Sequence, residues 1–403
     1  MNSDNEMKLN PYRWPLHILV ILYYTMGFMV RFAWPPLIPL VTADLGISMA
    51  KAGAYMSAFY IGYVLIHIPG GLLGDRFGSR LVIDTALLVE GLGTLGLGLV
   101  SDFNLGFACR VLTGLGAGAI YSACVRYVST LFPPKEAGLA FGLMMMAPAG
   151  VGIILPNLLM PWLSTVLSWR QSFIVLSGIV FLMSVVTFIV VRDKPALAQR
   201  RMSFGESFMA VIKNRNLVFL ALASFWLMWV MVGFVSWGNT YVKELGFSVS
   251  TASLVMMAYG LTGIAASPLG GYLGQKISNP MAMFIILLLC LAPCVWGFGQ
   301  SRSLWTLAAF SGAVGFIIGL ANPLLPLLTA MFAGPELRAT AGGVTGCIFQ
   351  TGAILGPLAV GLSKDYTGGF ALAWQLLTAA ALVGAACLIP MVRKGARAAA
   401  QSA

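Results

Sequence analysis

Charged side chains are scarce in this sequence. Only 9% of its 403 residues are Asp, Glu, Lys or Arg, whereas soluble domains carry roughly 25%. So low a charge content excludes a soluble globular protein and a disordered chain. The 24 Lys and Arg residues are spread along the chain, which excludes the dense basic patch of a nucleic-acid-binding protein.

Histidine and cysteine are also few. The two histidines lie far apart in the chain, and the six cysteines fall inside hydrophobic segments without the spacing of a metal site or a disulfide framework. We therefore expect the cysteines to be small packing residues. We expect no metal ion and no other cofactor.

Long hydrophobic runs are what the sequence has in abundance, with 59% hydrophobic residues. A membrane helix needs about 20 mostly apolar residues, and the sequence contains twelve such runs. It therefore predicts an all-α integral membrane protein with twelve transmembrane helices. We place them at residues 15–39, 52–73, 81–100, 105–131, 138–163, 171–191, 217–242, 251–275, 281–299, 304–332, 340–362 and 371–391.

One longer polar segment divides these spans into two sets of six. We expect an N-terminal six-helix bundle at 1–192, a cytoplasmic inter-bundle loop at 193–215 and a C-terminal six-helix bundle at 216–403. The other connections are too short for an extramembrane domain. The first apolar run is too long for a cleaved signal peptide, so we expect it to remain as a span.

The basic residues are distributed unevenly between the two sides of the membrane. If both termini are cytoplasmic, seventeen Lys and Arg residues lie in inner segments, five lie in outer segments, and Arg31 and Arg110 lie within spans. The five outer residues are Lys51, Arg170, Lys243, Arg302 and Lys364. Cytoplasmic loops carry the excess of Lys and Arg. This distribution predicts an integral protein of the plasma (inner) membrane with both termini cytoplasmic.

The two halves of the sequence repeat at an offset of 200 residues. Leu45-Gly46 recurs as Leu245-Gly246, and the glycine-rich segment 70–74 recurs at 270–274. Four further residues, Phe132, Glu136, Gly142 and Gly152, recur at 332, 336, 342 and 352. A constant offset of this kind predicts two bundles related by an axis along the membrane normal. In transporters built this way, the substrate site lies between the bundles near the middle of the membrane.

The segment 70–80, GGLLGDRFGSR, falls in the expected cytoplasmic turn between spans 2 and 3. It resembles the signature loop of the major facilitator superfamily. The resemblance implies that Asp75, Arg76 and Arg80 are gating residues, and the alternative is anchoring at the membrane interface. The repeated copy ends at Lys276 without the acid.

Span 4 carries a second resemblance to this superfamily, in Arg110 followed by Gly114, Gly116 and Gly118. Glycines four residues apart open one face of a helix for close packing. A structural or gating role for Arg110 and a substrate role both remain open. Span 5 contains Ala147 where the antiporter motif of the superfamily has glycine, so it gives no support for drug export.

Within the superfamily, residues 45–80 are most similar to the anion–cation symporters and the related organophosphate exchangers. The similarity includes Asp44-Leu45-Gly46, Ser57-Ala58-Phe59 and Gly62-Tyr63. It implies a transporter of small anions.

Arg31 is the most informative residue of the chain. It lies about 12 Å inside span 1, at 1.5 Å per residue, where an arginine costs at least ~2.5–3.5 kcal/mol. Pro35 and Pro36 follow and remove N–H groups that the carbonyls of the preceding turn need. A broken helix beside a buried cation favours a ligand site. Resemblance to anion transporters likewise implies that Arg31 binds the anionic group, and the alternative is a structural ion pair.

A second cation is missing where phosphate exchangers carry one. The position in span 7 that corresponds to Arg31 is Met231, so a two-arginine clamp for phosphate is not expected. A monocarboxylate or a sugar acid fits better. Arg126 is either a second cation of the site or a side chain that reaches the inner interface.

Three groups are candidates for proton coupling. Proton-coupled relatives often have a glutamate in span 4 seven residues after the arginine, but Ala117 occupies that position here. Glu90 lies in the middle of span 3, and Asp84 and His67 lie nearer the cytoplasm. A buried carboxyl is suited to proton transfer. Because span 3 is peripheral in this superfamily, a packed neutral acid is the alternative for Glu90.

Polar and aromatic residues in the remaining spans are candidates for the substrate site. Those expected to face the centre, beside Arg31, are Tyr24, Tyr60, Tyr121, Asn157, Trp237, Asn322 and Gln350. Hydrogen bonding between helices and anchoring at the interface are the alternatives for these residues.

The sequence therefore predicts a secondary transporter, not an enzyme, that moves a small organic anion through the lipid bilayer by alternating access. We expect proton symport, with exchange for a counter-anion as the next choice, and a monomer without nucleic acid. A drug or lipophile–proton antiporter of the same fold is one alternative, and a non-transporting membrane sensor is another. An intramembrane enzyme would need a catalytic constellation that the spans lack.

Overall fold

The structure is a computed structural model that describes residues 11–191 and 204–401, and this part of the chain is helical without a strand. One helix, η1 (Pro35–Leu37), is a 3-10 helix. The first α-helices are α1 (Arg13–Phe32), α2 (Ile38–Leu45), α3 (Met49–Phe77), α4 (Ser79–Leu99), α5 (Phe103–Leu131), α6 (Pro134–Val166) and α7 (Trp169–Val190). The rest are α8 (Phe204–Lys213), α9 (Arg215–Glu244), α10 (Val249–Lys276), α11 (Pro280–Gln300), α12 (Leu304–Ala321), α13 (Leu324–Thr367) and α14 (Ala371–Gln401).

The helices agree with the twelve expected spans. Ten segments of the described chain are long and apolar enough to cross a membrane. The other two expected spans correspond to α3 and α6, helices of 29 and 33 residues. One long helix, α13, is kinked at Gly334, where φ is 70°. Its first part continues the span that begins with α12, and its second part forms the next span.

The first span is broken beside Arg31, as expected. Helix α1 ends at Phe32, and the chain continues through Trp34 into η1. The Trp34 indole N–H donates a hydrogen bond of 3.1 Å to the carbonyl oxygen of Ala52. This bond attaches the break to α3, so the end of α1 and the first turns of α3 are held as one unit.

The sequence repeat is visible in local structure. Gly46 and Gly246 both have positive φ, 60° and 97°, in the turns before α3 and α10, a conformation that favours glycine. Ser48 and Ser248 then cap these two helices, and each side-chain oxygen accepts the N–H three residues later. The same turn and cap thus begin the second span of each half.

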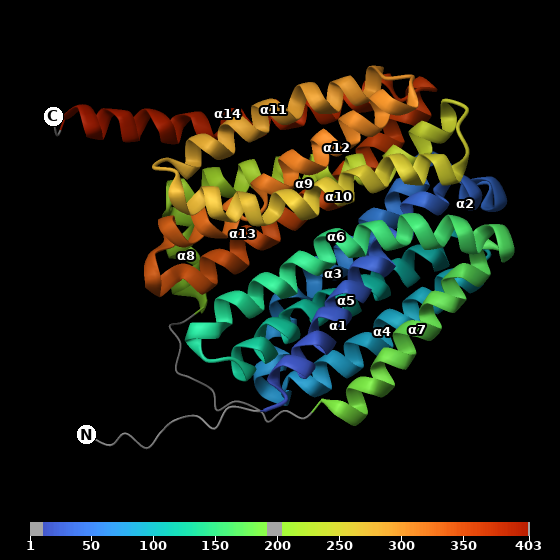
Figure 1. Cartoon of the computed structure of the whole chain (residues 1–403), viewed down its shortest axis with the longest axis horizontal. Coiled ribbons are helices and arrows are strands. Elements are labelled where there is room, and N and C mark those ends of the chain that lie inside the picture. Colours follow the sequence, from blue (N-terminus) through green and yellow to red (C-terminus); the bar gives the residue numbers. More distant parts are fainter. Residues whose placement is uncertain (1–10, 192–203, 402–403) are drawn as a thin grey trace.

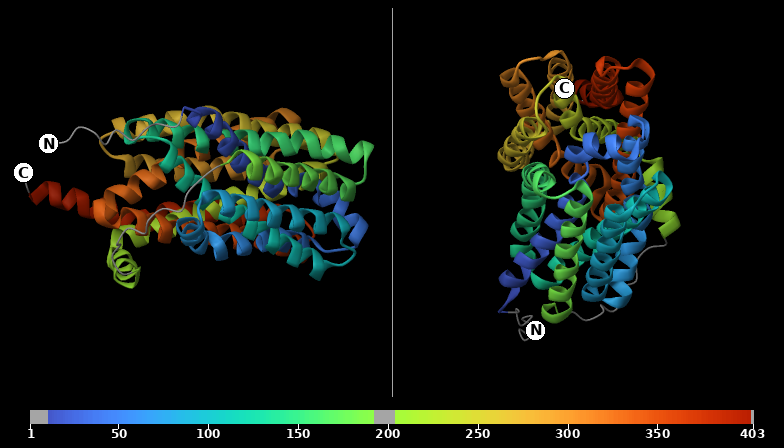
Figure 2. Two further views of the ribbon diagram at one scale, coloured as in Figure 1. Left: turned by 90° about the horizontal axis from the view of Figure 1, so that it is seen from below. Right: turned by 90° about the vertical axis from the view of Figure 1, so that its right-hand side faces the viewer.

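The helices form two groups side by side (Figure 1). Helices α1–α7 make one group and α9–α14 the other, and the closest contacts between the groups run along α3 with α13 and α6 with α10. Helix α1 begins and α14 ends at the same end of the bundle (Figures 1 and 2). We call this the terminal end, and the opposite end, where α2 lies, the distal end.

The segment expected as an inter-bundle loop is partly helical. Residues 193–203 lie outside the described residues, but α8 occupies 204–213. Val211 of α8 is buried with Leu217, Ala341 and Val344 in a small apolar cluster. The amphipathic sequence of α8 gives it an apolar side to pack against α13, and for this reason the segment is not a simple loop.

Candidate functional site

Arg31 lies in the last turn of α1, and its side chain is 3% exposed. Aromatic rings surround its guanidinium group. The distance from the Arg31 Cζ to the ring centroid is 4.5 Å for Phe28, 4.8 Å for Tyr63 and 5.1 Å for both Phe59 and Tyr60. Rings at such distances attract a cation. We call these five residues the Arg31 cluster.

The guanidinium group of Arg31 has no acidic partner in the part of the chain that the structure describes. The ion pairs found there join other residues, and the Arg31 Nε has no hydrogen-bond acceptor within 11–191 and 204–401. A structural ion pair, the alternative role for Arg31, is thus not formed with any described acid. A buried cation with an unused N–H group is suited to bind an anion.

A second row of rings extends from the Arg31 cluster, and we call it the ring stack. It starts at Tyr63, whose ring centroid is 5.5 Å from that of His67. His67 stacks on Tyr121 at 5.3 Å with an angle of 8° between the ring planes, and Tyr121 lies 5.4 Å from Tyr24. The structure therefore brings His67, Tyr121 and Tyr24 together beside Arg31. No hydrogen bond reaches the buried Nδ1 of His67 from the described residues.

The C-terminal half also contributes to this region. Gln350 of α13 is 8% exposed, and its side chain is close to the Tyr63 hydroxyl. Its Oε1 has no hydrogen-bond donor among the described residues. A Cβ on Gly346, one turn earlier in α13, would lie 3.8 Å from the His67 Nε2. The Arg31 cluster and the ring stack thus lie where the two groups of helices meet.

Glu90 faces the same region, although span 3 was expected to be peripheral. Its side chain is fully buried, and neither carboxyl oxygen has a hydrogen-bond partner in the described chain. Its Oε1 lies 3.7 Å from the position of a Cβ on Gly27, one turn before Arg31. Helix α4 itself packs mainly on α5 and α7, as expected for a peripheral span, and it turns Glu90 toward α1 and α5.

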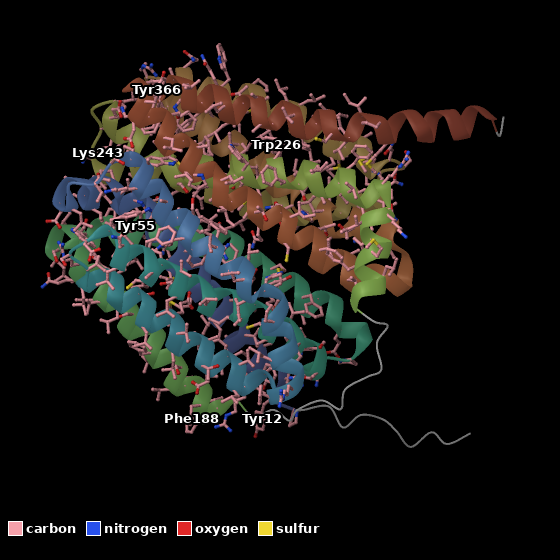
Figure 3. The ribbon with its side chains drawn as sticks, turned by 180° about the vertical axis from the view of Figure 1, so that it is seen from behind. Tyr12, Tyr55, Phe188, Trp226, Lys243 and Tyr366 are labelled. Atoms are coloured by element: carbon pink, nitrogen blue, oxygen red, sulfur yellow. The ribbon has the colours of Figure 1, made fainter. Side chains whose placement is uncertain are left out.

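Arg110 is buried against α3. Its Nε donates a hydrogen bond of 3.2 Å to the carbonyl oxygen of Tyr55, a residue labelled in Figure 3. Its Cζ lies 5.0 Å from the ring centroid of Phe59. Phe59 therefore contacts the two intramembrane cations, Arg31 and Arg110. The hydrogen bond to the Tyr55 carbonyl oxygen holds the Arg110 side chain against the backbone of α3.

The glycines that follow Arg110 allow α5 to approach α3 closely. A Cβ on Gly114 would lie 2.8 Å from the carbonyl carbon of Phe59 and 3.0 Å from the backbone nitrogen of Tyr63. Any side chain at this position would therefore displace the backbone that carries two rings of the Arg31 cluster.

Asn157 joins the two groups of helices. Its Oδ1 accepts a hydrogen bond of 3.0 Å from the Nδ2 of Asn239, and the Asn239 Oδ1 accepts one of 3.2 Å from Ser253. All three side chains are at most 2% exposed. The amides of Asn157 and Asn239 are already hydrogen-bonded to each other. Hydrogen bonding between helices is the alternative role expected for Asn157.

Three other candidate residues form different contacts. The Trp237 indole N–H donates to the carbonyl oxygen of Pro357 at 2.9 Å, within the C-terminal group. Asn322 lies at the break between α12 and α13. Asp84 accepts a hydrogen bond of 2.5 Å from Ser184 of α7. The structure thus does not show Trp237, Asn322 or Asp84 bonded to the Arg31 cluster.

The signature loop lies at the terminal end, between α3 and α4. The side chain of Asp75 lies outside the described residues. Arg76 is exposed above the ring of Phe77. The Arg80 Nη2 donates to the carbonyl oxygen of Phe188 at 2.5 Å, and the Arg126 Nη1 donates to the Ser79 hydroxyl at 2.6 Å. Arg126 thus reaches the loop at the start of α4.

The two groups of helices are held together at the distal end. The carboxyl oxygens of Asp365 accept hydrogen bonds of 3.0 Å from the N–H of Met49 and 2.7 Å from that of Ala50. The Ser57 hydroxyl bonds to the carbonyl oxygen of Ile354. A carboxylate at a helix N-terminus is favoured by the helix dipole, so Asp365 of α13 caps α3. This contact joins the two groups of helices at the distal end.

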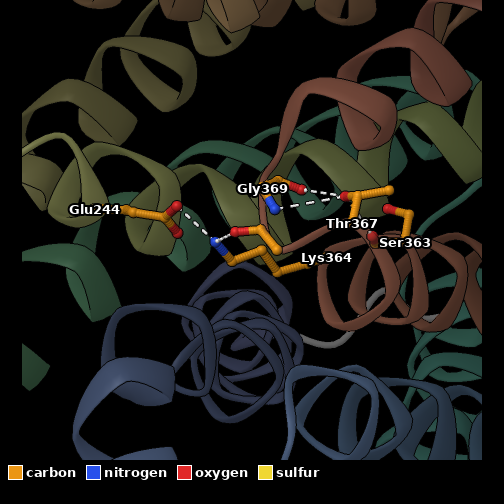
Figure 4. Close-up of polar contacts among 6 residues, drawn as sticks. Glu244, Ser363, Lys364, Thr367 and Gly369 are labelled. Atoms are coloured by element: carbon orange, nitrogen blue, oxygen red, sulfur yellow. Dashed lines mark hydrogen bonds and ion pairs between the residues drawn. The ribbon is translucent and has the colours of Figure 1, made fainter.

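Lys364, the neighbour of Asp365, bonds within its own half. Its Nζ lies 2.5 Å from the Oε1 of Glu244 and 2.8 Å from the carbonyl oxygen of Gly368 (Figure 4). Adjacent residues of α13 therefore serve two different contacts, one within the C-terminal group and one between the groups.

Sequence reasoning missed Phe28, Phe59, Tyr63 and Asn239. The spacing of aromatic residues at 55, 59, 63 and 67 along α3 is four, which places them on one helix face. That spacing was a usable signal for Phe59 and Tyr63. Asn239 carries no comparable signal, because its role depends on two helices distant in sequence.

The chain matches the Major Facilitator Superfamily over residues 18–357. It is 24% identical to the hexuronate transporter of Bacillus subtilis over 400 residues, which cover 94% of each chain. It is 27% identical to the 4-hydroxybenzoate transporter PcaK of Pseudomonas aeruginosa over 434 residues, which cover 97% of this chain and 94% of the relative.

Solved structures show the same fold. A bacterial homologue of the human lysosomal transporter Spinster, in an inward-facing and occupied conformation, superimposes with a TM-score of 0.79 at 18% identity. The match covers 95% of this chain and 97% of that one. Together with the family match over most of the sequence, this likeness identifies the protein as an integral membrane transporter that belongs to the Major Facilitator Superfamily.

Proposed function

We propose that the protein moves a small organic anion, a carboxylate or a sugar acid, by alternating access, and that Arg31 binds its anionic group. One observation carries this proposal: Arg31 is 3% exposed and its Nε has no acceptor among the described residues. A bound anion would accept the hydrogen bond that the Arg31 Nε does not make within the described residues. Charge-assisted hydrogen bonds of this kind are worth about 1.5–3 kcal/mol each.

The names of the relatives support an anionic substrate. They include a hexuronate transporter of Bacillus subtilis, a D-galactonate transporter of Escherichia coli and a 4-hydroxybenzoate transporter of Pseudomonas aeruginosa. All three substrates carry one carboxylate. A single carboxylate matches a site with Arg31 as its cation and Met231 at the repeat-related position.

We assign proton symport to this transporter, with Glu90 as the proton carrier. The Glu90 carboxyl is fully buried, unpaired among the described residues and close to α1 one turn from Arg31. An unpaired carboxyl inside a span is suited to bind and release a proton. Binding of the anion at Arg31 alters the charge beside Glu90. Anion binding and proton binding are thereby linked. Exchange for a counter-anion is the alternative.

The terminal end is assigned to the cytoplasm, because most Lys and Arg residues of the loops belong to that side. The closed distal contacts at Asp365 and Ser57 then lie on the outer side. In this arrangement the substrate leaves the site toward the terminal end.

Uptake by purified protein in proteoliposomes tests the proposal. Galacturonate, benzoate and a lipophilic cation are offered with and without an inward proton gradient. We expect gradient-driven uptake of a carboxylate, which Arg31→Ala lowers by about 10- to 100-fold. Uptake of the cation alone, unaffected by Arg31→Ala, would instead support a drug–proton antiporter, and transport of none of the three would support a membrane sensor.

A further inference from the structure

We infer that an anionic phospholipid binds at the terminal end of the C-terminal group, with its phosphate on Arg215 and its acyl chains along α9 and α14. This site is separate from the Arg31 cluster and does not depend on the substrate proposed above. Three features of the described residues support it: a cavity beside Arg215, the depth of that cavity in the membrane, and the sign of the charges around it.

A cavity of about 360 Å³ lies between the start of α9 and the later turns of α14. Arg215 and Asn216 of α9 line it with polar groups, and Val218, Phe219 and Met391 provide apolar walls. Ligand pockets of roughly 300–1,000 Å³ are built in this way, from apolar walls with a few polar groups. Such a lining suits a ligand that carries a charged group next to hydrocarbon.

The cavity lies where two membrane spans end. The span of α9 begins at Arg215. The apolar run of α14 ends shortly after Met391, because Arg393 and Lys394 follow in the sequence. Since Arg215 and Met391 both line the cavity, it lies at the level where the polar headgroups of a bilayer meet the hydrocarbon core. A lipid phosphate is found at the same level.

Partly exposed apolar side chains continue from the cavity into the membrane along α9. Val218, Leu222 and Trp226 (labelled in Figure 3) follow Arg215 at intervals of three or four residues, which places them on one helix face. Leu222 is 42% exposed. Trp226 packs on α14, since a Cβ on Gly384 would lie 3.1 Å from the Trp226 Cβ. An acyl chain that leaves the cavity therefore finds an apolar surface that extends about 16 Å, at 1.5 Å per residue.

The charges around the cavity favour an anionic headgroup over a zwitterionic one. Arg215 is exposed, and none of the described residues that line the cavity is acidic. Lys213 is exposed two residues earlier, and Arg393, Lys394 and Arg397 follow the α14 wall in the sequence. A zwitterionic lipid would bring its own cationic group among these residues, whereas an anionic lipid brings only negative charge. Basic pockets between helices bind anionic headgroups for this reason.

Arg215 is the group that holds the phosphate. The N-terminus of α9 is already capped, because the Asn214 Oδ1 accepts hydrogen bonds of 3.1 Å from the N–H of Asn216 and 3.4 Å from that of Leu217. The ion pairs of the described chain join other residues, so the Arg215 guanidinium has no acidic partner there. A planar guanidinium binds two phosphate oxygens at once. The phosphate therefore binds the Arg215 side chain and not the end of the helix.

Native mass spectrometry of the full-length, delipidated protein in detergent tests this site. Phosphatidylglycerol and phosphatidylcholine with identical acyl chains share the hydrocarbon and the phosphate but differ in net charge. We expect the wild type to bind its first phosphatidylglycerol at least tenfold more tightly than phosphatidylcholine. Glycerol 3-phosphate is the soluble probe, and we expect it to compete poorly because it has no acyl chains.

Two variants alter the site in different ways. Arg215→Gln removes the cation, and Val218→Trp retains the cation but fills the cavity. We expect each variant to bind phosphatidylglycerol at least tenfold more weakly than the wild type. Lys276→Gln is the matched control, because Lys276 is an exposed cation in the last turn of α10, at the same end of the bundle, and does not line the cavity. It should bind phosphatidylglycerol as the wild type does.

Four outcomes would overturn the lipid site. Equal binding of the two lipids by the wild type would refute selection of an anionic headgroup. Equal loss in Arg215→Gln and Lys276→Gln would indicate general attraction by charge, and wild-type affinity in folded Arg215→Gln or Val218→Trp would refute binding in this cavity. Competition by glycerol 3-phosphate at the concentration of the lipid would indicate a soluble phosphate ligand. If Val218→Trp fails to fold, the comparison of Arg215→Gln with Lys276→Gln still decides the question.

Discussion

The Glu90 Oε1 lies 3.7 Å from the Cβ position of Gly27, on the helix that carries Arg31 one turn later. This relationship places an acid of α4 beside the proposed anion site. It also places an acid near position 117, where the resemblance to proton-coupled relatives implies a glutamate and this chain has alanine. A Cβ on Gly27 would lie 3.8 Å from the Cβ of Ala117 and 3.7 Å from the Glu90 carboxyl. The carboxyl therefore lies near that position, although it comes from a different helix.

The first prediction concerns proton coupling. In Glu90→Gln, a neutral amide replaces the group that would bind and release the proton. We expect uptake to lose its response to an inward proton gradient, while exchange of labelled for unlabelled carboxylate continues. Parallel measurements of uptake and exchange in proteoliposomes check this. A response to the gradient that persists in Glu90→Gln would exclude Glu90 as the proton carrier.

The second prediction concerns the contact between α3 and α5. In Gly114→Ala, the new methyl group meets the Phe59 carbonyl, and such overpacking costs about 1–3 kcal/mol. We expect a lower melting temperature in detergent and weaker carboxylate binding. Gly178→Ala in α7 is the matched control, because a Cβ there meets no atom within 4 Å. It should melt at the wild-type temperature or slightly above it. Equal melting temperatures of the two variants would contradict the close packing of α5 on α3.

The third prediction concerns the distal contact. Asp365→Ala removes the cap that α13 provides for α3, and loss of such a cap costs about 0.5–2 kcal/mol. We expect faster hydrogen–deuterium exchange in α13 residues 354–361, which pack against Met49, Gly53 and Ser57 of α3. Lys364→Ala is the control, since the bonds it breaks, to Glu244 and to the Gly368 carbonyl oxygen, both lie within the C-terminal half. Equal exchange in the two variants would mean that Asp365 does not hold the distal side closed.

The positions of the spans along the chain could be predicted from the sequence, but rotation about the helix axis could not. The run lengths predicted the spans, and Pro35-Pro36 predicted the break beside Arg31, because both effects are local to the chain. Asp84 and Glu90 illustrate the limit. They are six residues apart, which is about 240° around a helix. Asp84 therefore bonds to Ser184 of α7, and Glu90 faces α1 and α5.

The candidate site shows the same division. Tyr24, Tyr60, Tyr121, His67 and Gln350 were expected from polarity within spans, and the structure brings them together around Arg31 and Tyr63. Trp237 has the same kind of sequence signal, yet its N–H is used by the Pro357 carbonyl. Which polar side chain is free for a ligand depends on the packing between helices, and a single sequence does not contain that information.

The role of Arg31 is the central claim, and transport by its variants tests it most directly. Uptake of benzoate and of galacturonate is measured in proteoliposomes containing wild type, Arg31→Lys or Arg31→Ala, each shown to be folded by its elution and melting temperature. For any anion that the wild type transports, we expect Arg31→Ala to lose about 10- to 100-fold in uptake, the equivalent of one charge-assisted contact. Arg31→Lys should retain part of the activity. Wild-type uptake of either anion by folded Arg31→Ala would contradict the account.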